Sequence, residues 1–176
     1  TSISGLDRRL LDAASKGALK SIRLLLSQGA NIDARDEEDA TPLIQAAANG
    51  HARTVSTLCE RGASVNATTI YDVSALLAGI LFPHEPNVLV IKALLDAGAS
   101  IELTNDSGVT PLLAACHRGD YDIVTLLLDR GANADVYDEN GSFPSAQWMA
   151  NATDAGVPPD LVQKVVVRLL RKKKGQ

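Results

Sequence analysis

Aromatic residues are scarce in this chain, at 3% of its 176 residues, although 45% of the residues are hydrophobic. With so few aromatic rings, the core is expected to be filled mainly by leucine, alanine and valine. Such a composition is typical of helices that pack closely on small side chains. The sequence also has no run of about 18 consecutive apolar residues and no charged-then-apolar leader. These absences predict no membrane span, no signal peptide, and a location in the cytoplasm or nucleus.

Catalytic and metal-binding patterns are missing as well. The sequence contains no HExxH, CxxC, GxSxG or GxxxxGK[ST] motif. Its two cysteines, Cys59 and Cys116, are expected to be small buried residues in a reducing compartment rather than a disulfide or a metal pair. His117 follows Cys116, but adjacent residues on a helix point about 100° apart and do not form a nucleophile–base pair. The sequence therefore predicts a protein that is not an enzyme and uses no cofactor or metal.

Basic charge is confined largely to the C-terminus. Arg168, Arg171 and Lys172 to Lys174 carry five positive charges, so without them the net charge of −4 becomes −9. An acidic body disfavours nucleic acid, because binding to phosphates requires a basic face. The same acidity favours a basic protein or peptide as partner.

The stretch 105–132 carries the pattern on which the rest of the chain is organised. Thr110 can cap a helix that begins at Pro111, where the missing N–H costs nothing. Gly119 ends that helix, a second apolar stripe follows, and Gly131 ends the second helix. The stretch predicts two antiparallel helices joined by a tight turn. A unit of this size cannot bury its own apolar face, so similar units must stack on it.

Copies of this unit recur through the chain. Glycine–alanine pairs begin at Gly29, Gly62, Gly98 and Gly131, with spacings of 33, 36 and 33 residues. The segments TPLIQAAANGH (residues 41–51) and TPLLAACHRGD (residues 110–120) resemble the ankyrin repeat. The resemblance implies a single all-α domain over residues 1–176, an ankyrin-repeat solenoid of about five helix-turn-helix units with β-turn or hairpin fingers. The expected units span about 5–35, 36–68, 69–104, 105–137 and 138–157, followed by a capping helix at about 160–172 and a basic tail at 171–176.

The third unit departs most from the pattern. Ser74 and Ala75 replace threonine and proline, and three residues are inserted within 81–87, where Pro83 and Pro86 prevent a continuous helix. Such an insertion is either a site where function collects or neutral change in a surface loop. In the second unit, His51 stands where the family commonly has histidine. We expect His51 to bond loop backbone between units.

The resemblance also implies that a protein partner is recognised by the fingers and by the exposed side of the inner helices. One region places large apolar residues where solvent-facing ones are expected, with Tyr71 and Phe82 as its main anchors. The alternative for Phe82 is that it folds inward beneath the long loop. An acidic first finger would steer a basic partner. The predicted partner-binding residues are Ile70, Tyr71, Val73, Leu81, Phe82, His117, Arg118, Tyr137, Glu37 and Glu38.

Two hypotheses for function remain open at this point. The first is a non-catalytic protein-interaction module, monomeric in isolation, that binds a protein or peptide on its concave face. The second is a structural spacer or self-assembly unit without a dedicated ligand. A contiguous apolar patch near Tyr71 would favour the first, whereas an even polar groove would favour the second.

Overall fold

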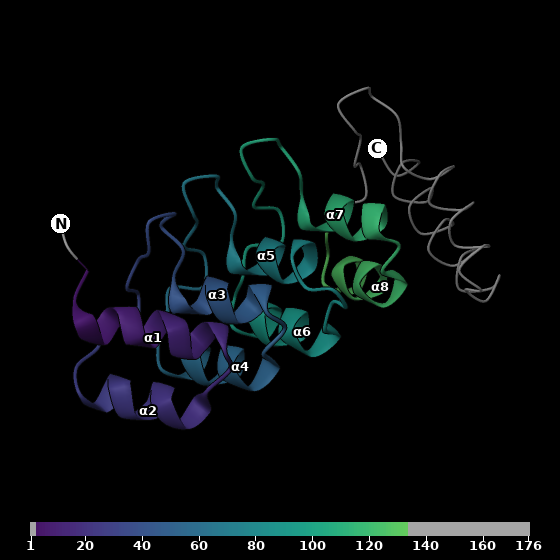
Figure 1. Ribbon diagram of the computed structural model, residues 1–176. Helices are drawn as coiled ribbons and strands as arrows, with labels where there is room; N and C mark the ends of the chain where they lie inside the picture. Colours follow the sequence, from purple (N-terminus) through teal and green to yellow (C-terminus); the bar gives the residue numbers. More distant parts are fainter. Residues whose placement is uncertain (1–2, 134–176) are drawn as a thin grey trace, which may run out of the picture.

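The structure is a computed structural model that describes residues 3–133, and within this range it is helical (Figure 1). The helices form two rows (Figure 1). We call α1, α3, α5 and α7 the inner helices and α2, α4, α6 and α8 the outer helices. The predicted all-α repeat solenoid is confirmed, while the expected fifth unit and capping helix lie outside the described residues. The helices are α1 (Gly5–Ser15), α2 (Leu19–Ser27), α3 (Pro42–Ala48), α4 (Ala52–Glu60), α5 (Ala75–Leu81), α6 (Val88–Asp96), α7 (Pro111–Arg118) and α8 (Tyr121–Asp129).

Hydroxyl side chains begin the inner helices. Thr110 Oγ1 accepts a hydrogen bond from the Leu113 N–H at 3.1 Å, and Pro111 occupies the first helical position, as predicted. In the third unit, Ser74 Oγ accepts from the Leu77 N–H at 3.3 Å. Serine therefore caps α5 in the same way that threonine caps α7, because either hydroxyl can satisfy an N–H that the first turn leaves without a partner.

The core lies between the two rows and repeats from unit to unit. One leucine per inner helix and one β-branched residue per outer helix are fully or almost fully buried at equivalent positions. Burying each such side chain stabilises the fold by about 1.5–3 kcal/mol. Every unit thus contributes the same two kinds of side chain to a shared interior. The residues are Leu10, Leu43, Leu76 and Leu112 on the inner helices, and Ile22, Val55, Ile91 and Val124 on the outer ones.

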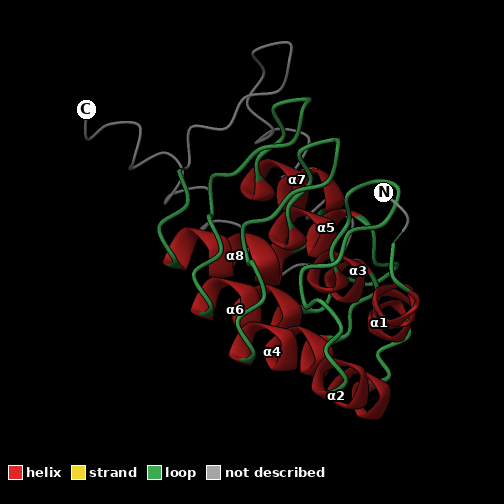
Figure 2. Ribbon diagram, turned by 90° about the vertical axis from the view of Figure 1, so that its left-hand side faces the viewer, coloured by secondary structure: helices red, strands yellow, loops and turns green. Residues whose placement is uncertain are grey.

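In the part of the chain that the structure describes, three loops project beyond the row of inner helices (Figure 2). We call residues 36–40, 69–73 and 105–109 the second, third and fourth fingers, after their units. Each finger begins with a side chain that accepts hydrogen bonds from two backbone N–H groups, two and four residues later. Aspartate, threonine and asparagine all perform this task, since each carries a short oxygen acceptor. The acceptors are Asp36 Oδ1, Thr69 Oγ1 and Asn105 Oδ1.

Backbone hydrogen bonds connect neighbouring fingers. The Ile70 N–H donates to the Glu38 carbonyl at 3.0 Å, and the Asp106 N–H donates to the Tyr71 carbonyl at 3.2 Å. Within residues 3–133 the β-structure consists of one isolated bridge, between Thr68 and Ser74. The fingers therefore hold a fixed spacing without forming an extended sheet.

A second set of bonds fixes the register of the units near the ends of the outer helices. In each case a polar side chain of one unit accepts from a backbone N–H that follows the glycine–alanine pair of the next unit. Asp7, at the start of α1, makes the equivalent bond within the first unit, to the Asn31 N–H at 2.7 Å. The other pairs are Asp33 with Ser64, Asn66 with Ser100 and Glu102 with Asn133.

The described helices are also short. None of those in residues 3–133 has the length and apolar character needed to cross a lipid bilayer.

Candidate protein-binding surface

The tip of the third finger exposes two large apolar side chains. Ile70 is 56% exposed and Tyr71 is 51% exposed. Thr69 Oγ1 holds the Tyr71 N–H at 3.2 Å, and the bonds from Ile70 to Glu38 and from Asp106 to Tyr71 connect the tip to both neighbouring fingers. The two side chains are consequently presented on a backbone that is fixed before any partner arrives.

Val73, at the base of the same finger, faces the other way. It is only 6% exposed and packs in the core. Ala40, at the equivalent position of the second finger, is also buried, because the chain here returns to the inner helix row. The prediction that Val73 is a solvent-facing binding residue was therefore wrong.

Phe82 lies at the other end of α5 from the third finger. Its side chain is 61% exposed, so the alternative that it folds inward beneath the loop was wrong. Leu81 is half-buried and packs against the core. The seven residues of α5, about 10 Å of helix, separate Phe82 from the base of the finger that carries Tyr71. The expected apolar region is therefore divided into two separate sites, one at Ile70 and Tyr71 and the other at Phe82.

Carboxylates surround the apolar tip. The exposed residues Glu37, Glu38 and Asp39 lie on the second finger, Asp72 lies on the third and Asp106 on the fourth. Arg35 is close by, but its Nη1 donates to the Asp39 carbonyl at 3.0 Å and to the Thr68 carbonyl at 2.9 Å. That guanidinium ties the second finger to the base of the third, so negative charge dominates the described tips.

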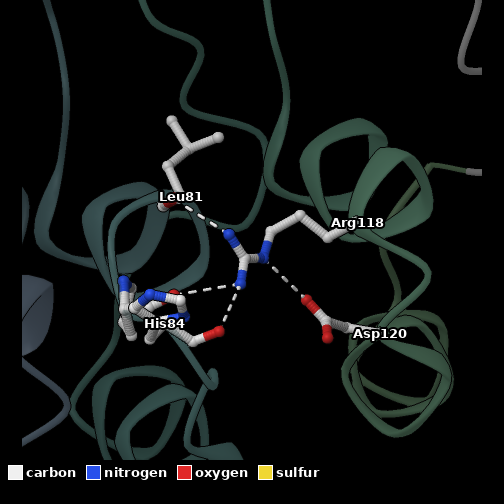
Figure 3. A network of polar contacts seen from close by, with 5 residues as sticks. Leu81, His84, Arg118 and Asp120 are labelled. Carbon is white, nitrogen blue, oxygen red and sulfur yellow. Dashed lines mark hydrogen bonds and ion pairs between the residues drawn. The ribbon is translucent and has the colours of Figure 1, made fainter.

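Arg118 turns out to hold the long loop of the third unit (Figure 3). Its guanidinium donates to three backbone carbonyls, those of Leu81 at 3.1 Å, Pro83 at 3.0 Å and His84 at 3.3 Å. Its Nε lies 3.1 Å from Asp120 Oδ2. Sequence analysis assigned Arg118 to partner binding, but its polar atoms are already engaged within the chain.

The residue types suit this role, although no local pattern in the sequence pairs Arg118 with the loop. Arginine carries five N–H donors in a planar fork, and a proline-containing insertion offers carbonyls that no helix satisfies. Arg118 occupies the position in its unit that Phe82 occupies in the preceding one. His117, beside it, is exposed at the end of α7, and Tyr137 lies outside the described residues.

The metal-ligating side chains and the two cysteines of the described residues were the candidates for chemistry. Among residues 3–133 there is no group of three or more histidine, cysteine, aspartate or glutamate side chains able to hold a metal ion. Burial raises the pKa of the Cys116 thiol to about 12, and burial, together with the charge of Glu60, raises the pKa of Cys59. Neither thiol is activated as a nucleophile, and Cys116 is also buried, whereas Cys59 is partly accessible to solvent.

His51 has the structural task expected of it. Its Nε2 lies 2.8 Å from the carbonyl oxygen of Ser15, in the preceding unit. A carbonyl only accepts, so Nε2 must carry the proton. The ring also fills the space in front of Gly17, where a Cβ atom would lie 2.8 Å from it.

A family model described as ankyrin repeats (many copies) matches residues 10–59 and 81–128, which is more than half of the chain. The chain belongs to the ankyrin-repeat family. The third finger and nearly all of helix α5 lie between the two matched segments.

Curated relatives share only part of their length with this ankyrin-repeat chain. An ankyrin repeat, SAM and basic leucine zipper domain-containing protein 1 from Nomascus leucogenys is 34% identical over 84 residues, covering 48% of this chain and 17% of that protein. Its counterpart from Notamacropus eugenii is 32% identical over 71 residues, covering 40% of this chain and 15% of that protein. Protein phosphatase 1 regulatory subunit 27 from Homo sapiens is 37% identical over 59 residues, covering 34% of this chain and 38% of that protein. The chain thus spans well under half of the length of each relative.

Proposed function

We propose that this chain is a non-catalytic interaction module that binds a protein or peptide partner on the concave face, through its fingers and inner helices. Ankyrin repeats are generally protein-interaction modules. One of the relatives is by name a regulatory subunit of a protein phosphatase, and regulation by a subunit requires binding to a protein. This support concerns the class of function. The choice of face follows the family resemblance, and the choice of residues rests on which finger side chains are exposed.

The observation that carries the proposal is the exposed pair Ile70 and Tyr71 at the tip of the third finger. These two adjacent apolar side chains are not part of the buried core, and a fixed turn presents them to solvent, where a partner can cover them. Tyrosine is also among the residues that contribute most to interfaces, because it buries a large area with few torsions to immobilise. We take Tyr71 as the main anchor, with Ile70 beside it.

The charge around this pair supports a basic partner. Glu37 and Glu38 precede the apolar tip in the stack, Asp72 adjoins it and Asp106 follows it. A segment with lysine or arginine beside a large apolar residue would complement both features. Such charges act mainly on the rate of association and on specificity, and salt weakens their effect.

The proposal is tested by selecting peptides from a random displayed library on the 176-residue chain. Selected peptides should carry lysine or arginine beside a large apolar residue. Tyr71→Ala should weaken their binding by about 2 kcal/mol, which is roughly 30-fold in Kd. The matched control is Ser107→Ala, because Ser107 occupies the same position in the fourth finger. Affinities are measured by fluorescence polarisation at two salt concentrations.

Two results would contradict the proposal. One is a selection that yields no specific binder, which would favour the structural-spacer hypothesis. The other is a set of binders whose affinity is equally insensitive to Tyr71→Ala and to Ser107→Ala. Arg118→Ala is a poor probe of binding, since it also releases the loop at residues 82–84.

A further inference from the structure

The outer helix row carries a groove that the fingers do not border. It lies between α4 and α6, has a volume of about 630 Å³, and is lined by residues of these helices. Arg53, Ser56 and Cys59 line it on α4, and Leu89 and Ala93 line it on α6. The small side chains on both walls leave the space open between two helices that otherwise pack closely. The groove is thus separate from the finger surface discussed above.

Leu89 does not follow the pattern of the other outer helices. It is 63% exposed, at the second position of α6. The residues at this position in the other three outer helices of residues 3–133 are all charged: Lys20, Arg53 and Asp122. A charged residue there keeps the outer face in water, whereas leucine at the mouth of a groove exposes an apolar edge without serving the core.

Charge is distributed along the groove from one end to the other. Arg53 lies near the first turns and Glu60 at the last residue of α4. On α6, Lys92 lies in the middle and Asp96 is the last residue. Asp96 pairs with Arg130 at 2.8 Å. Arg53, Lys92 and Glu60 take part in no ion pair within residues 3–133, so their charges face solvent.

We propose that this groove binds an amphipathic helix. Helices α4 and α6 are nine residues each, about 14 Å long, which matches two to three turns of a docked helix. Leucine or alanine side chains of the occupant pack on Leu89 and Ala93 of α6 and on Cys59 of α4. An acidic first turn faces Arg53, and a basic last turn faces Glu60. A docked helix would present its apolar stripe to Leu89 and Ala93 and keep its polar face in solvent.

The direction of the occupant follows from the same charges. Helices are ordinarily stabilised by acidic residues in the first turn and basic residues in the last. An occupant with that ordinary pattern satisfies Arg53 and Glu60 together only when it runs parallel to α4 and α6.

The test uses a synthetic helical peptide of about 10 residues, or nearly three turns, stapled on its exposed face, with glutamates in the first turn, leucines on one side and arginines in the last turn. Its binding is followed through the rate at which a thiol reagent modifies Cys59. Cys59 lines the groove, whereas Cys116 is buried with a pKa of about 12 and serves as an internal control. Saturating peptide should slow modification of Cys59 about tenfold or more, as expected for a site that is closed over 90% of the time.

Substitutions of solvent-exposed residues distinguish binding in this groove from binding elsewhere on the chain. Leu89→Glu and Arg53→Glu should each raise the peptide concentration needed for half-maximal protection of Cys59 about tenfold, or 1.4 kcal/mol. Lys20→Glu, at the equivalent position of α2, should leave it unchanged, as should Tyr71→Ala at the finger tip. A peptide with its charges exchanged end for end should bind more weakly to the wild-type chain and more strongly to Arg53→Glu. Absence of protection, or protection that survives both Leu89→Glu and Arg53→Glu, would overturn the proposal.

Discussion

The second and third units place equivalent leucines, Leu43 and Leu76, in the same shared core, yet they connect their helices differently. Three residues, 49–51, join α3 to α4, whereas six, 82–87, join α5 to α6. The insertion is located where the sequence predicted it. Because the additional residues lie at the end of the helices, neither row is displaced.

The start of the outer helix remains in the same place in both units. In the second unit, His51 precedes α4 and its Nε2 donates to the Ser15 carbonyl at 2.8 Å. In the third unit, Asn87 precedes α6 and its Nδ2 donates to the Gly50 carbonyl at 3.2 Å. Two chemically different side chains thus make the bond to the preceding unit. The longer link requires a further contact, which Arg118 supplies from the fourth unit.

The finger tips differ more than the links. Glu37 and Glu38 occupy the positions in the second finger that Ile70 and Tyr71 occupy in the third. Since the same turn and the same interfinger bonds support both pairs, their side chains are free of any folding requirement. The core and the backbone bonds thus define the unit, while the finger tip is where this chain can differ in what it binds.

The largest effect should come from the core leucines. Leu43→Ala and Leu76→Ala each remove a fully or almost fully buried side chain, and each should lower the free energy of unfolding by about 2–5 kcal/mol. Urea denaturation followed by circular dichroism measures both. Similar losses would show that the irregular third unit is packed as well as the second. A loss below about 1 kcal/mol for Leu76→Ala would show that the third unit is less well packed than the second, because such a small value indicates a loosely packed site.

Arg118→Ala should have the next largest effect, concentrated in the third unit. It removes three hydrogen bonds to loop carbonyls and an ion pair with Asp120, and we expect a loss of about 1–2 kcal/mol because the side chain is partly exposed. Hydrogen exchange should accelerate in residues 82–87 while residues 49–51 are unaffected. Arg118→Lys should not restore protection, since one ammonium does not reproduce the planar fork. Uniform exchange across both links would contradict the assigned role.

Much of this fold was predictable because the signals are local. The glycine spacing, Thr110 before Pro111 and the prolines of the long loop each act within a few residues of their own position. The direction of Val73 was not predictable in the same way, since the finger turns back toward the core before α5 begins. The role of Arg118 depends on carbonyls 34 to 37 residues away, in another unit. Tertiary contacts of this kind leave no periodic trace in one sequence.

Substitutions at the two inter-unit bonds should have intermediate effects. His51→Ala removes one hydrogen bond to Ser15 and should cost about 1 kcal/mol. Asn87→Ala should cost about 1.5 kcal/mol, because Asn87 Oδ1 also accepts from the Leu89 N–H at 3.0 Å and so caps α6. Urea midpoints at constant m value measure the difference. A greater loss for His51→Ala would indicate that its ring packing against Gly17 outweighs the missing cap.

The smallest effect should arise at the finger turns, and it has the opposite sign. Asp39 and Asp72 have φ values of 60° and 57°, whereas Gly108 occupies the equivalent place in the fourth finger with a φ of 72°. Asp39→Gly and Asp72→Gly relieve the strain of a left-handed residue but increase the freedom of the unfolded chain. We expect a net gain of about 0.5 kcal/mol for each, measured as a small rise in Tm.

Gly108→Ala is the matched control and should be destabilised by about 1 kcal/mol, because alanine is strained at this φ. Asp72→Gly also removes a carboxylate beside Tyr71, so peptides selected for basic residues should bind it more slowly although it is more stable. Stability and binding would then change in opposite directions at one residue, as expected if the tip carboxylates serve recognition. A gain in the second finger alone would mean instead that the bond from Arg35 to the Asp39 carbonyl alters the turn.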